Sequence, residues 1–527
     1  GGGDALAQQQ QQQQQQQLIQ LLTACVSPDE HARKDAERMV QSSGAVFGFG
    51  DLLCRTAFGL DDVVDGHHHL NIPMDIRQLA ALLLKKYVRE RWQVGEHFFI
   101  EGEPMTSVEE KMAIRGKICA GLRMKDSKMR TACALVIAQI ATHDWPEEWE
   151  GLLGELLVPI REKRDVDHVN GALRCMSMLC GDLEERQLPK LVPELFPDLF
   201  GLLQASDDGL NGIDKDQMTM VKCRALDVTR GCYSNLGMIG DDQIRFQIKE
   251  AAKPFLESNF VAYGNIFEFR SDVFETAGGC TLTLSALKAM QATVQYFGKE
   301  ITGGQVVSEQ TFGGCVERFF HVFEKAANRY VQCRGVEVDA LDDCEDDMGD
   351  KVSNAAVVTQ CMELAMTMIE STKIAKSCIQ PRLKSLVSIA VATSLTTDDQ
   401  LETWEDDVNQ FVADEEDDYQ SVRATSGIFL ATACAKFSKI FYVVFAEVVA
   451  ELFSQSFEEQ KNNDENWWRR REAALLAVGS VSDELVEQDK EARGKNMSPA
   501  FDCNAFLNEI IRSEFTATPT SSNPFLK

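Results

Sequence analysis

The chain has 527 residues, 44% of them hydrophobic, so it can bury a large core but is too long for one compact domain. Its 82 acidic residues outnumber its 53 basic residues and give a formal net charge of −29 at pH 7. This charge repels nucleic acids and anionic membranes and favours a basic protein partner, so we expect no direct nucleic-acid binding. Acidity that only keeps a large chain soluble would look the same, and charge alone leaves both interpretations open.

The N-terminal segment, residues 1–17, is of low complexity and ends in ten consecutive glutamines, residues 8–17. Such a run extends the helix that follows it or stays disordered. The segment lacks the basic and apolar regions of a secretory signal. No window of the chain reaches the ~18 uninterrupted apolar residues of a membrane span. The most apolar stretch, residues 440–453, carries Glu447 and Glu451, so we expect no membrane insertion.

The sixteen cysteines predict a reducing compartment, because no C-x-x-C pair occurs and most of them lie within apolar helical segments. The three adjacent histidines, residues 67–69, cannot all face one ion from a regular element. No nucleophile, base and orienting carboxylate recur at a spacing typical of a catalytic site. We therefore expect a protein that is not an enzyme, with no cofactor and no metal site.

From Leu18 onward, nearly every periodic segment has apolar residues at i, i+3, i+4 and i+7, which indicates amphipathic helices, and no convincing strand pattern occurs. The helices occur in pairs, and the first helix of a tenth pair is expected at about 500–515. The nine complete pairs are predicted at 5–42, 46–92, 107–142, 146–181, 188–235, 244–297, 308–370, 374–437 and 439–486.

An arginine near the start of the second helix recurs in most pairs and is followed by small residues. Its spacings are 44, 53, 44 and 50 residues among the first five positions and 48 between the last two, close to the ~40–47 residue period of HEAT repeats. Such an arginine can reach an acidic partner in the neighbouring pair. The positions are Arg33, Arg77, Arg130, Arg174, Arg224, Arg423 and Arg471.

The pattern predicts an all-α fold, a HEAT-repeat α-solenoid in which antiparallel helix pairs stack into a curved, elongated superhelical array. We expect N-terminal repeats over 18–235, middle repeats over 236–515 and a truncated end at 516–527. The last predicted helix is unpaired and no polar cap follows it, so we expect the sequence to be truncated.

The stretch 82–92 is the main basic exception in this acidic chain, with Lys85, Lys86, Arg89 and Arg91. One interpretation is the charged outer face of an amphipathic helix. The other is a basic strip on an inner helix that grips an acidic partner surface.

The stretch "THDWPEEWEGLL", residues 142–153, is interpreted as structural. Asp144 is expected to be the N-cap of a helix and Pro146 an early helical residue. Trp145 and Trp149 are expected to pack at the turn.

Two acidic stretches interrupt the helix pairs and are expected to be loops. Residues 337–350 contain eight carboxylates, and residues 402–418 contain nine carboxylates without a lysine or arginine. The second stretch also holds apolar anchors, so it is suited to clamp a basic surface of cargo or of a second partner. Its candidate residues are Trp404, Glu405, Asp406, Asp407, Phe411, Asp414, Glu415, Glu416, Asp417 and Asp418.

Several of these stretches resemble one known family. "IRQLAALLLKKYVRERW" at 76–92 resembles the N-terminal signature of importin-β karyopherins. The segments 128–153, 404–423 and 466–481 are similar to the importin-9 branch of that family. The match runs over most of residues 18–527, about half the length of a receptor of this family, so it covers the N-terminal half.

The resemblance implies a nuclear import receptor that carries core histone dimers and other basic nuclear proteins and is regulated by Ran-GTP. It further implies Ran binding by the N-terminal repeats, for which we select Lys85, Lys86 and Arg89, and contact of the acidic loop with Ran or cargo. Nucleoporins are expected as further partners, and shuttling between cytoplasm and nucleus is expected. The alternatives are a HEAT-repeat scaffold subunit of a multiprotein complex and a histone chaperone without a transport role.

Overall fold

The computed structural model describes residues 2–59, 72–94, 98–100, 104–182, 187–205, 214–268, 271–337, 341, 344–345, 351–407, 409–410, 413, 421–510 and 512. Within these ranges the regular secondary structure is helical, and the only β feature is an isolated antiparallel bridge between Glu345 and Lys351. The predicted all-α class is confirmed. The chain divides into two compact units, an N-terminal unit, Gly1–Ala252, and a C-terminal unit, Lys253–Lys527.

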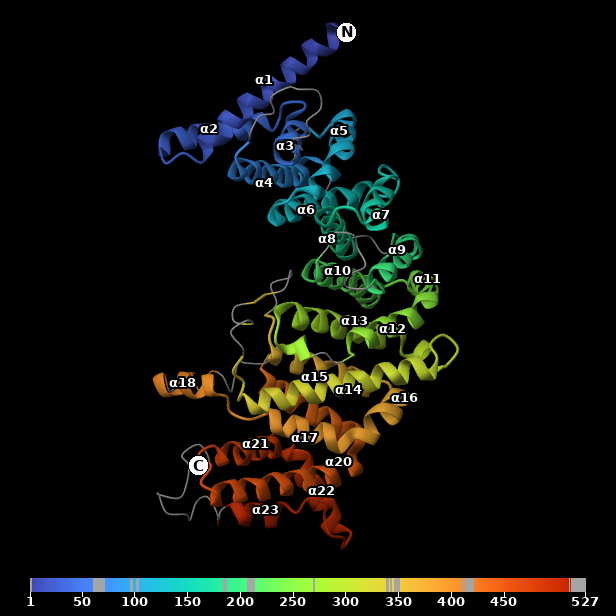
Figure 1. The fold of residues 1–527 in the computed structure, drawn as a ribbon, viewed down its shortest axis with the longest axis vertical. Helices are drawn as coiled ribbons and strands as arrows, with labels where there is room; N and C mark the ends of the chain where they lie inside the picture. Colours follow the sequence, from blue (N-terminus) through green and yellow to red (C-terminus); the bar gives the residue numbers. More distant parts are fainter. Residues whose placement is uncertain are drawn as a thin grey trace. The chain divides into compact units, whose positions relative to one another are not determined.

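The N-terminal unit is a succession of antiparallel helix pairs (Figure 1). Its helices are α1 (Gly2–Cys25), α2 (Glu30–Ser43), α3 (Phe49–Phe58), α4 (Met74–Arg91), α5 (Val108–Ile118), η1 (Cys119–Arg123), α6 (Ser127–Asp144), α7 (Leu152–Glu162), α8 (Val166–Asp182), α9 (Leu188–Leu203), α10 (Lys215–Ser234), η2 (Asn235–Gly237) and α11 (Asp242–Ala252).

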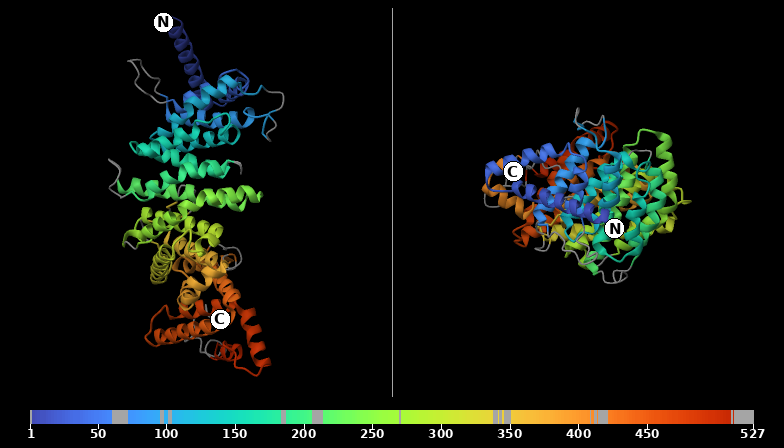
Figure 2. Two further views of the ribbon diagram at one scale, coloured as in Figure 1. Left: turned by 90° about the vertical axis from the view of Figure 1, so that its right-hand side faces the viewer. Right: turned by 90° about the horizontal axis from the view of Figure 1, so that it is seen from above.

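Two rows of helices build this unit. The second helices of the pairs contact one another in order, α4 with α6, α6 with α8 and α8 with α10. The first helices form a parallel row in which α3 contacts α5, α7 contacts α9 and α9 contacts α11. The side view in Figure 2 shows the helices of this unit lying in successive layers. Each layer buries its apolar face only against its neighbours, as a solenoid does.

Helix starts follow local chemistry. The carboxylate of Asp126 accepts the backbone N–H of Met129 at 2.9 Å, and Asp214 forms a capping box with Gln217. The start of α3 is capped from the next pair, because Glu110 of α5 accepts the N–H groups of Gly48, Gly50 and Asp51 at 3.0, 2.6 and 3.2 Å.

Gly50 permits this close approach of the third pair to the second. A Cβ atom at this position would lie 2.4 Å from Cε1 of Tyr87 and 2.9 Å from Oε1 of Glu110. A residue with a side chain here would therefore displace the capping carboxylate or the ring.

The C-terminal unit continues the paired arrangement. Its helices are η3 (Lys253–Phe255), α12 (Leu256–Ile266), η4 (Ser271–Phe274), α13 (Ala277–Thr302), α14 (Glu309–Gln332), α15 (Asn354–Glu370), α16 (Thr372–Ile374), η6 (Ala375–Ile379), η7 (Gln380–Arg382), α17 (Leu383–Thr393), α18 (Asp398–Asp406), α20 (Val422–Lys461), α21 (Trp467–Ser480), α22 (Ser482–Gly494) and α23 (Cys503–Ile510).

Helix α20 serves two predicted pairs, because the helix is bent at Ser438, where φ is 38° and ψ is −107°. The bend lies between residue 437, the predicted end of the eighth pair, and residue 439, the predicted start of the ninth. By length and composition α20 is the one described helix that could cross a membrane. It packs on α15, α17 and α21, and Lys384 of α17 pairs with Glu447 and Glu451 in its second part. Packing covers part of its apolar surface, since 33% of its most apolar window is buried.

The ninth pair differs from the prediction at its end. Its second helix, α21, ends at Ser480 rather than near residue 486, because Val481 leaves the helical conformation with φ −126° and ψ 23°. Helix α22 begins directly afterwards and was not predicted as a separate element. The helix expected at about 500–515 corresponds to α23.

The recurrent arginines make two kinds of contact. Arg130 of α6 forms an ion pair with Asp167 of α8 at 2.9 Å, which confirms that such a residue reaches the neighbouring pair. Arg77 instead donates to the carbonyl of Gly59 at 2.8 Å, within its own pair. Arg224 of α10 donates to the carbonyl of Asn170 in α8 at 2.9 Å. Arg33 makes neither contact. Its side chain is 40% exposed and lies 4.0 Å from the carboxylate of Glu37, one turn further along the same helix.

The same contact joins two pairs in the C-terminal unit. Arg423 at the start of α20 donates to both carboxylate oxygens of Glu472 in α21, at 2.6 and 3.1 Å, and to the carbonyl of Ser394 at 2.8 Å. Only 12% and 13% of the two side chains are exposed.

We predict that Arg423→Ala lowers the free energy of unfolding of the C-terminal unit by about 3 kcal/mol, because it leaves the Glu472 carboxylate buried without its partner. Urea unfolding of the full chain, with hydrogen exchange of α20 and α21, measures this. The control is Lys495→Ala, which removes an exposed pair with Glu491 and should cost less than about 0.5 kcal/mol. Equal losses in the two variants would contradict a stabilising role for the Arg423 contact.

Candidate protein-binding surfaces

The basic face of α4 is formed by Lys85, Lys86 and Arg89, which the structure places together on the exposed side of the helix with Leu82. These four positions follow the i, i+3, i+4, i+7 spacing of one helix face. The opposite face, which includes Leu84 and Val88, is buried. Packing of this buried face fixes the helix, and the cationic face is exposed to solvent.

The three cations differ in how they are held. The Lys86 ammonium lies 3.9 Å from the Glu90 carboxylate, an exposed contact of small energy. The Arg89 guanidinium lies over the ring of Phe98, 4.7 Å from its centroid, and the ring orients it. Lys85 is exposed. This face can therefore present three positive charges to an acidic partner.

Helix α18 contains residues 402–406 of the acidic stretch 402–418, and Asp407 follows its end. Thr397 starts it with a capping box, since its hydroxyl accepts the N–H of Gln400 at 3.2 Å and its N–H donates to the Gln400 side chain at 3.0 Å. Trp404 is buried, with 6% of its surface exposed, whereas Glu405, Asp406 and Asp407 are exposed. The predicted residues Phe411 and Asp414, Glu415, Glu416, Asp417 and Asp418 lie outside the described residues.

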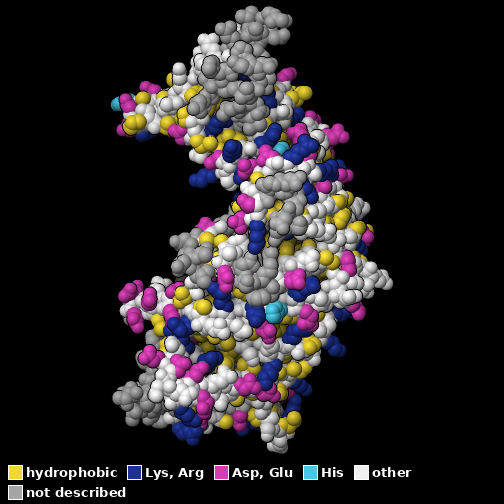
Figure 3. Space-filling model, viewed as in Figure 1, with side chains coloured by type: hydrophobic (Ala, Val, Ile, Leu, Met, Phe, Trp, Pro, Cys, Tyr) yellow, Lys and Arg dark blue, Asp and Glu magenta, His cyan; other side chains and the backbone are white. Residues whose placement is uncertain are grey.

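The space-filling view shows acidic side chains gathered on α18 (Figure 3). Since Trp404 fixes one side of this short helix, the carboxylates are held on the other side rather than spread along a free chain. An ordered anionic surface of this kind loses less conformational entropy on binding than a flexible one.

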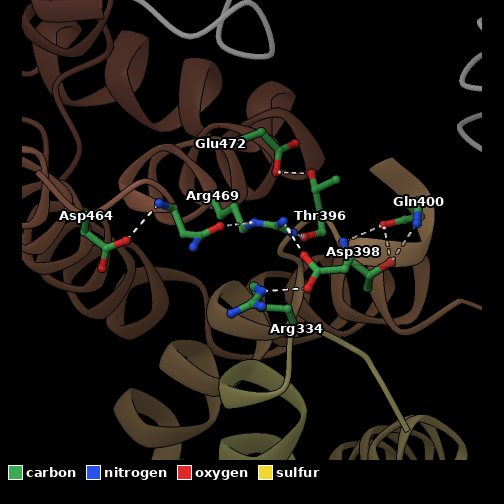
Figure 4. Close-up of polar contacts among 9 residues, drawn as sticks. Arg334, Thr396, Asp398, Gln400, Asp464, Arg469 and Glu472 are labelled. Carbon is green, nitrogen blue, oxygen red and sulfur yellow. Dashed lines mark hydrogen bonds and ion pairs between the residues drawn. The ribbon is translucent and has the colours of Figure 1, made fainter. Parts of the chain in front are cut away.

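The base of α18 is held by Asp398 (Figure 4). The Nε of Arg334, which follows α14, donates to its carboxylate at 2.7 Å, and Arg469 at the start of α21 donates to the other oxygen. Arg469 also donates to the carbonyl of Thr396 and to Oδ1 of Asn466, the latter at 3.1 Å. Burial lowers the pKa of Arg469, and the charge of Asp398 opposes that shift.

The network continues from Thr396, whose hydroxyl donates to the Glu472 carboxylate at 3.1 Å. Glu472 is the partner of Arg423, so the acidic helix and the contact between the eighth and ninth pairs share one set of charges. The prediction of a loop is wrong for residues 402–406, which are helical, and the capping-box sequence T-x-x-Q at 397–400 is the local signal for the start of α18.

The other acidic stretch, 337–350, is described only in part. Glu337 accepts the N–H groups of Asn354 and Ala355, both at 3.0 Å, so it caps the start of α15 instead of adding a free charge to a binding loop. Its residues 338–340, 342–343 and 346–350 lie outside the described residues, as do the three histidines at 67–69.

The expected roles of Asp144 and Pro146 are wrong. Asp144 is the last residue of α6, and its buried carboxylate accepts from Nε1 of Trp92 at 3.0 Å and pairs with Arg115 at 2.9 Å. It therefore caps no helix. The cis peptide Trp145–Pro146 lies in a turn, and α7 begins only at Leu152, after Gly151. Trp145 and Trp149 are both buried at this turn.

Comparison with known proteins finds similarity to importins and nuclear transport receptors. The Importin-beta N-terminal domain family matches residues 68–123, which include all of α4. Solved structures with the same fold include Kap121p bound to RanGTP, with a TM-score of 0.56 and 15% identity over 96% of this chain and 39% of that one. Another is Lph2 of S. cerevisiae, a bidirectional nuclear transport receptor, with a TM-score of 0.62 and 14% identity over 94% of this chain and 47% of that one.

These likenesses confirm that the fold is a karyopherin-type HEAT-repeat solenoid. The match to the Importin-beta N-terminal domain covers residues 68–123, and similarity to importins extends over most of the chain.

The chain is similar to Importin-9 of Drosophila melanogaster, with 22% identity over 90% of this chain and 44% of the relative. Importin subunit beta-5 of Schizosaccharomyces pombe is 21% identical over 76% of this chain and 38% of the relative. The chain thus spans less than half the length of these two proteins.

We predict that Asp398→Asn loosens α18, because Arg469 and Arg334 lose the charge that holds the helix base. Backbone hydrogen exchange across Asp398–Asp406 should accelerate about tenfold. Asp399→Asn is the matched control, since it removes a charge from the same first turn at an exposed position. Equal protection in the two variants would show that the arginines do not hold α18.

Proposed function

We propose that the chain forms the N-terminal part of a nuclear transport receptor that binds basic nuclear proteins, such as core histone dimers, and is regulated by Ran-GTP. The observation that carries this proposal is the Importin-beta N-terminal domain match at residues 68–123 together with a similarity to Importin-9 along 90% of the chain. The matched relatives are transport receptors, which supports a binding role rather than catalysis. A receptor of this kind moves between cytoplasm and nucleus.

Cargo binding by α18 is supported by its charge and its attachment. Its exposed carboxylates stand on a helix fixed at its base by Asp398 and on one side by Trp404. A basic protein surface would meet several charges in fixed positions, which favours fast, electrostatically steered association.

Ran binding is proposed for the basic face of α4, because it lies within the matched Importin-beta N-terminal domain. Kap121p, which shares the fold, has been solved bound to RanGTP and, separately, bound to Nup53p. We extend both kinds of partner, Ran and nucleoporins, to this chain as part of the proposal.

We predict that the triple variant Lys85→Glu, Lys86→Glu, Arg89→Glu weakens binding of Ran locked in the GTP form by at least about tenfold, because like charges then face the partner. Histone-dimer binding should not weaken, since the variant removes cations that repel a basic cargo. Biolayer interferometry on the full chain measures both affinities.

The control for this variant reverses three exposed cations elsewhere in the N-terminal unit, Arg161, Arg164 and Lys190, and should leave Ran binding unchanged. A folded parent chain that binds no Ran would overturn the regulation by Ran and would favour a histone chaperone or a scaffold subunit.

We predict that neutralising the acidic stretch weakens histone-dimer binding and slows Ran association, because seven negative charges are lost within thirteen positions of the chain. The binding of the parent should also fall steeply as salt rises, since exposed charges are screened beyond about 8 Å at physiological ionic strength. Fluorescence titration across a salt series measures both effects. The variant replaces Asp406, Asp407, Asp414, Glu415, Glu416, Asp417 and Asp418 by Ser or Asn.

A control variant of equal charge separates local from global effects. It neutralises exposed carboxylates of α2, α20 and α22 and should bind histones more tightly than the acidic-stretch variant. Equal binding by the two variants, or affinity that is flat with salt, would argue against the acidic stretch as a cargo surface. The control positions are Glu30, Asp35, Glu37, Glu458, Asp483, Glu487 and Glu491.

A further inference from the structure

A cavity of about 250 Å³ lies in the C-terminal unit between the end of α14, α17, the second part of α20 and the start of α21. Three guanidinium groups line it, those of Arg334, Arg469 and Arg470, and we call it the three-arginine pocket. Aliphatic side chains, among them Val331 and Leu452, also line it. An apolar lining lowers the local dielectric constant and strengthens any hydrogen bond that a guanidinium makes there.

The three arginines differ in the donors that remain. Arg469 uses Nε and both Nη atoms on Asn466, Thr396 and Asp398. Arg334 uses only Nε, on Asp398, and Arg470 uses only Nε, on Glu459 at 2.6 Å. Within the described ranges, the Nη groups of Arg334 and Arg470 donate to no acceptor. Both side chains are about two-fifths exposed, so a ligand can reach them.

The charges around the pocket nearly cancel, which limits the kind of ligand that it can select. Asp398, Glu459 and Asp464 offset the three arginines, so long-range attraction does not select an anion. Selection must come from directed hydrogen bonds, and guanidinium forks match the oxygens of phosphate and carboxylate. Two free forks, one following α14 and one in α21, offer more donors than one carboxylate can accept. A phosphate monoester has three terminal oxygens and a charge near −2, and fits better.

The pocket opens into a longer groove. A second cavity, of about 400 Å³, shares Val331, Ala392 and Arg470 with it, and a third, of about 360 Å³, shares Ser385 and Ile389 with the second. The groove runs between α14 and the second part of α20, with α17 beneath it. Its lining combines aliphatic residues and serine, asparagine and glutamine side chains with the carboxylates of Glu324 and Glu451, which suits an extended polar peptide.

We propose that this groove binds an extended segment of a partner protein and that a phosphorylated serine or threonine of the segment places its phosphate in the three-arginine pocket. The site contains none of the exposed residues assigned to Ran or to basic cargo, although Arg334 and Arg469 also hold the base of α18 through Asp398. The proposal does not rest on the transport function. It gives the acidic chain a second kind of partner, one selected by its phosphate rather than by positive charge.

The pocket is tested first with phenyl phosphate, a small phosphate monoester, by phosphorus NMR line broadening on the full chain. We expect saturable binding that weakens at least about fivefold in Arg470→Lys and in Arg334→Lys, because lysine keeps the charge but loses the fork. Arg493→Lys changes an exposed arginine of α22 that is paired with Asp489 and Asp502, and should bind like the parent. Circular dichroism melting confirms that each variant is folded.

Three results would overturn the pocket: no saturable binding by the parent, equal weakening in Arg493→Lys, or benzoate binding as tightly as phenyl phosphate. The groove is tested with a peptide library that has a fixed central phosphoserine and degenerate flanks, measured by fluorescence anisotropy beside its serine counterpart and inorganic phosphate. We expect selected phosphopeptides to bind at least about tenfold more tightly than inorganic phosphate. Equal affinities would remove the peptide groove and leave an anion pocket only.

Discussion

The arginine at the start of the second helix is the contact on which the array depends. A helix pair of this kind cannot bury its apolar face alone, so the position of each pair relative to the next must be set by something directional. Arg130 with Asp167 and Arg423 with Glu472 supply that direction between neighbouring second helices. Arg224 does the same through a main-chain carbonyl. Because the arginine side chains are largely buried, their positions are fixed as firmly as those of core residues.

A framework set in this way tolerates long insertions at the turns between helices. The stretch between α17 and α20 uses this freedom to present α18, and its Thr396–Asp398 base is tied to the charges that join the eighth and ninth pairs. The acidic surface is therefore an extension of the framework rather than a free tail. The structure thus combines rigid positioning with exposed charge, a combination that favours fast binding without a large ordering cost.

The sequence predicted the helix pairs because helical periodicity, caps and the recurrent arginine are local signals that agree with one another. It failed where a residue serves a distant partner. Asp144 looks like a cap but pairs with Arg115, and Glu337 looks like loop charge but caps α15. The three-arginine pocket contains Arg334 and Arg470, which are 136 residues apart in the sequence, so no local sequence pattern predicts it. The roles of Lys85, Lys86 and Arg89 come from family resemblance, and the structure adds only that they share an exposed face.

The capping of α3 by Glu110 has a consequence for how the chain is made. The first N–H groups of α3 find their acceptor some 60 residues further along, in the following helix pair. A chain emerging from the ribosome therefore holds an incomplete second pair until the third pair has been synthesised. In the same way, Arg130 has its ion-pair partner only after Asp167 of the next pair has been synthesised. The second and third pairs are thus completed by their successors, so for them the order of synthesis and the order of assembly run in the same direction along the chain.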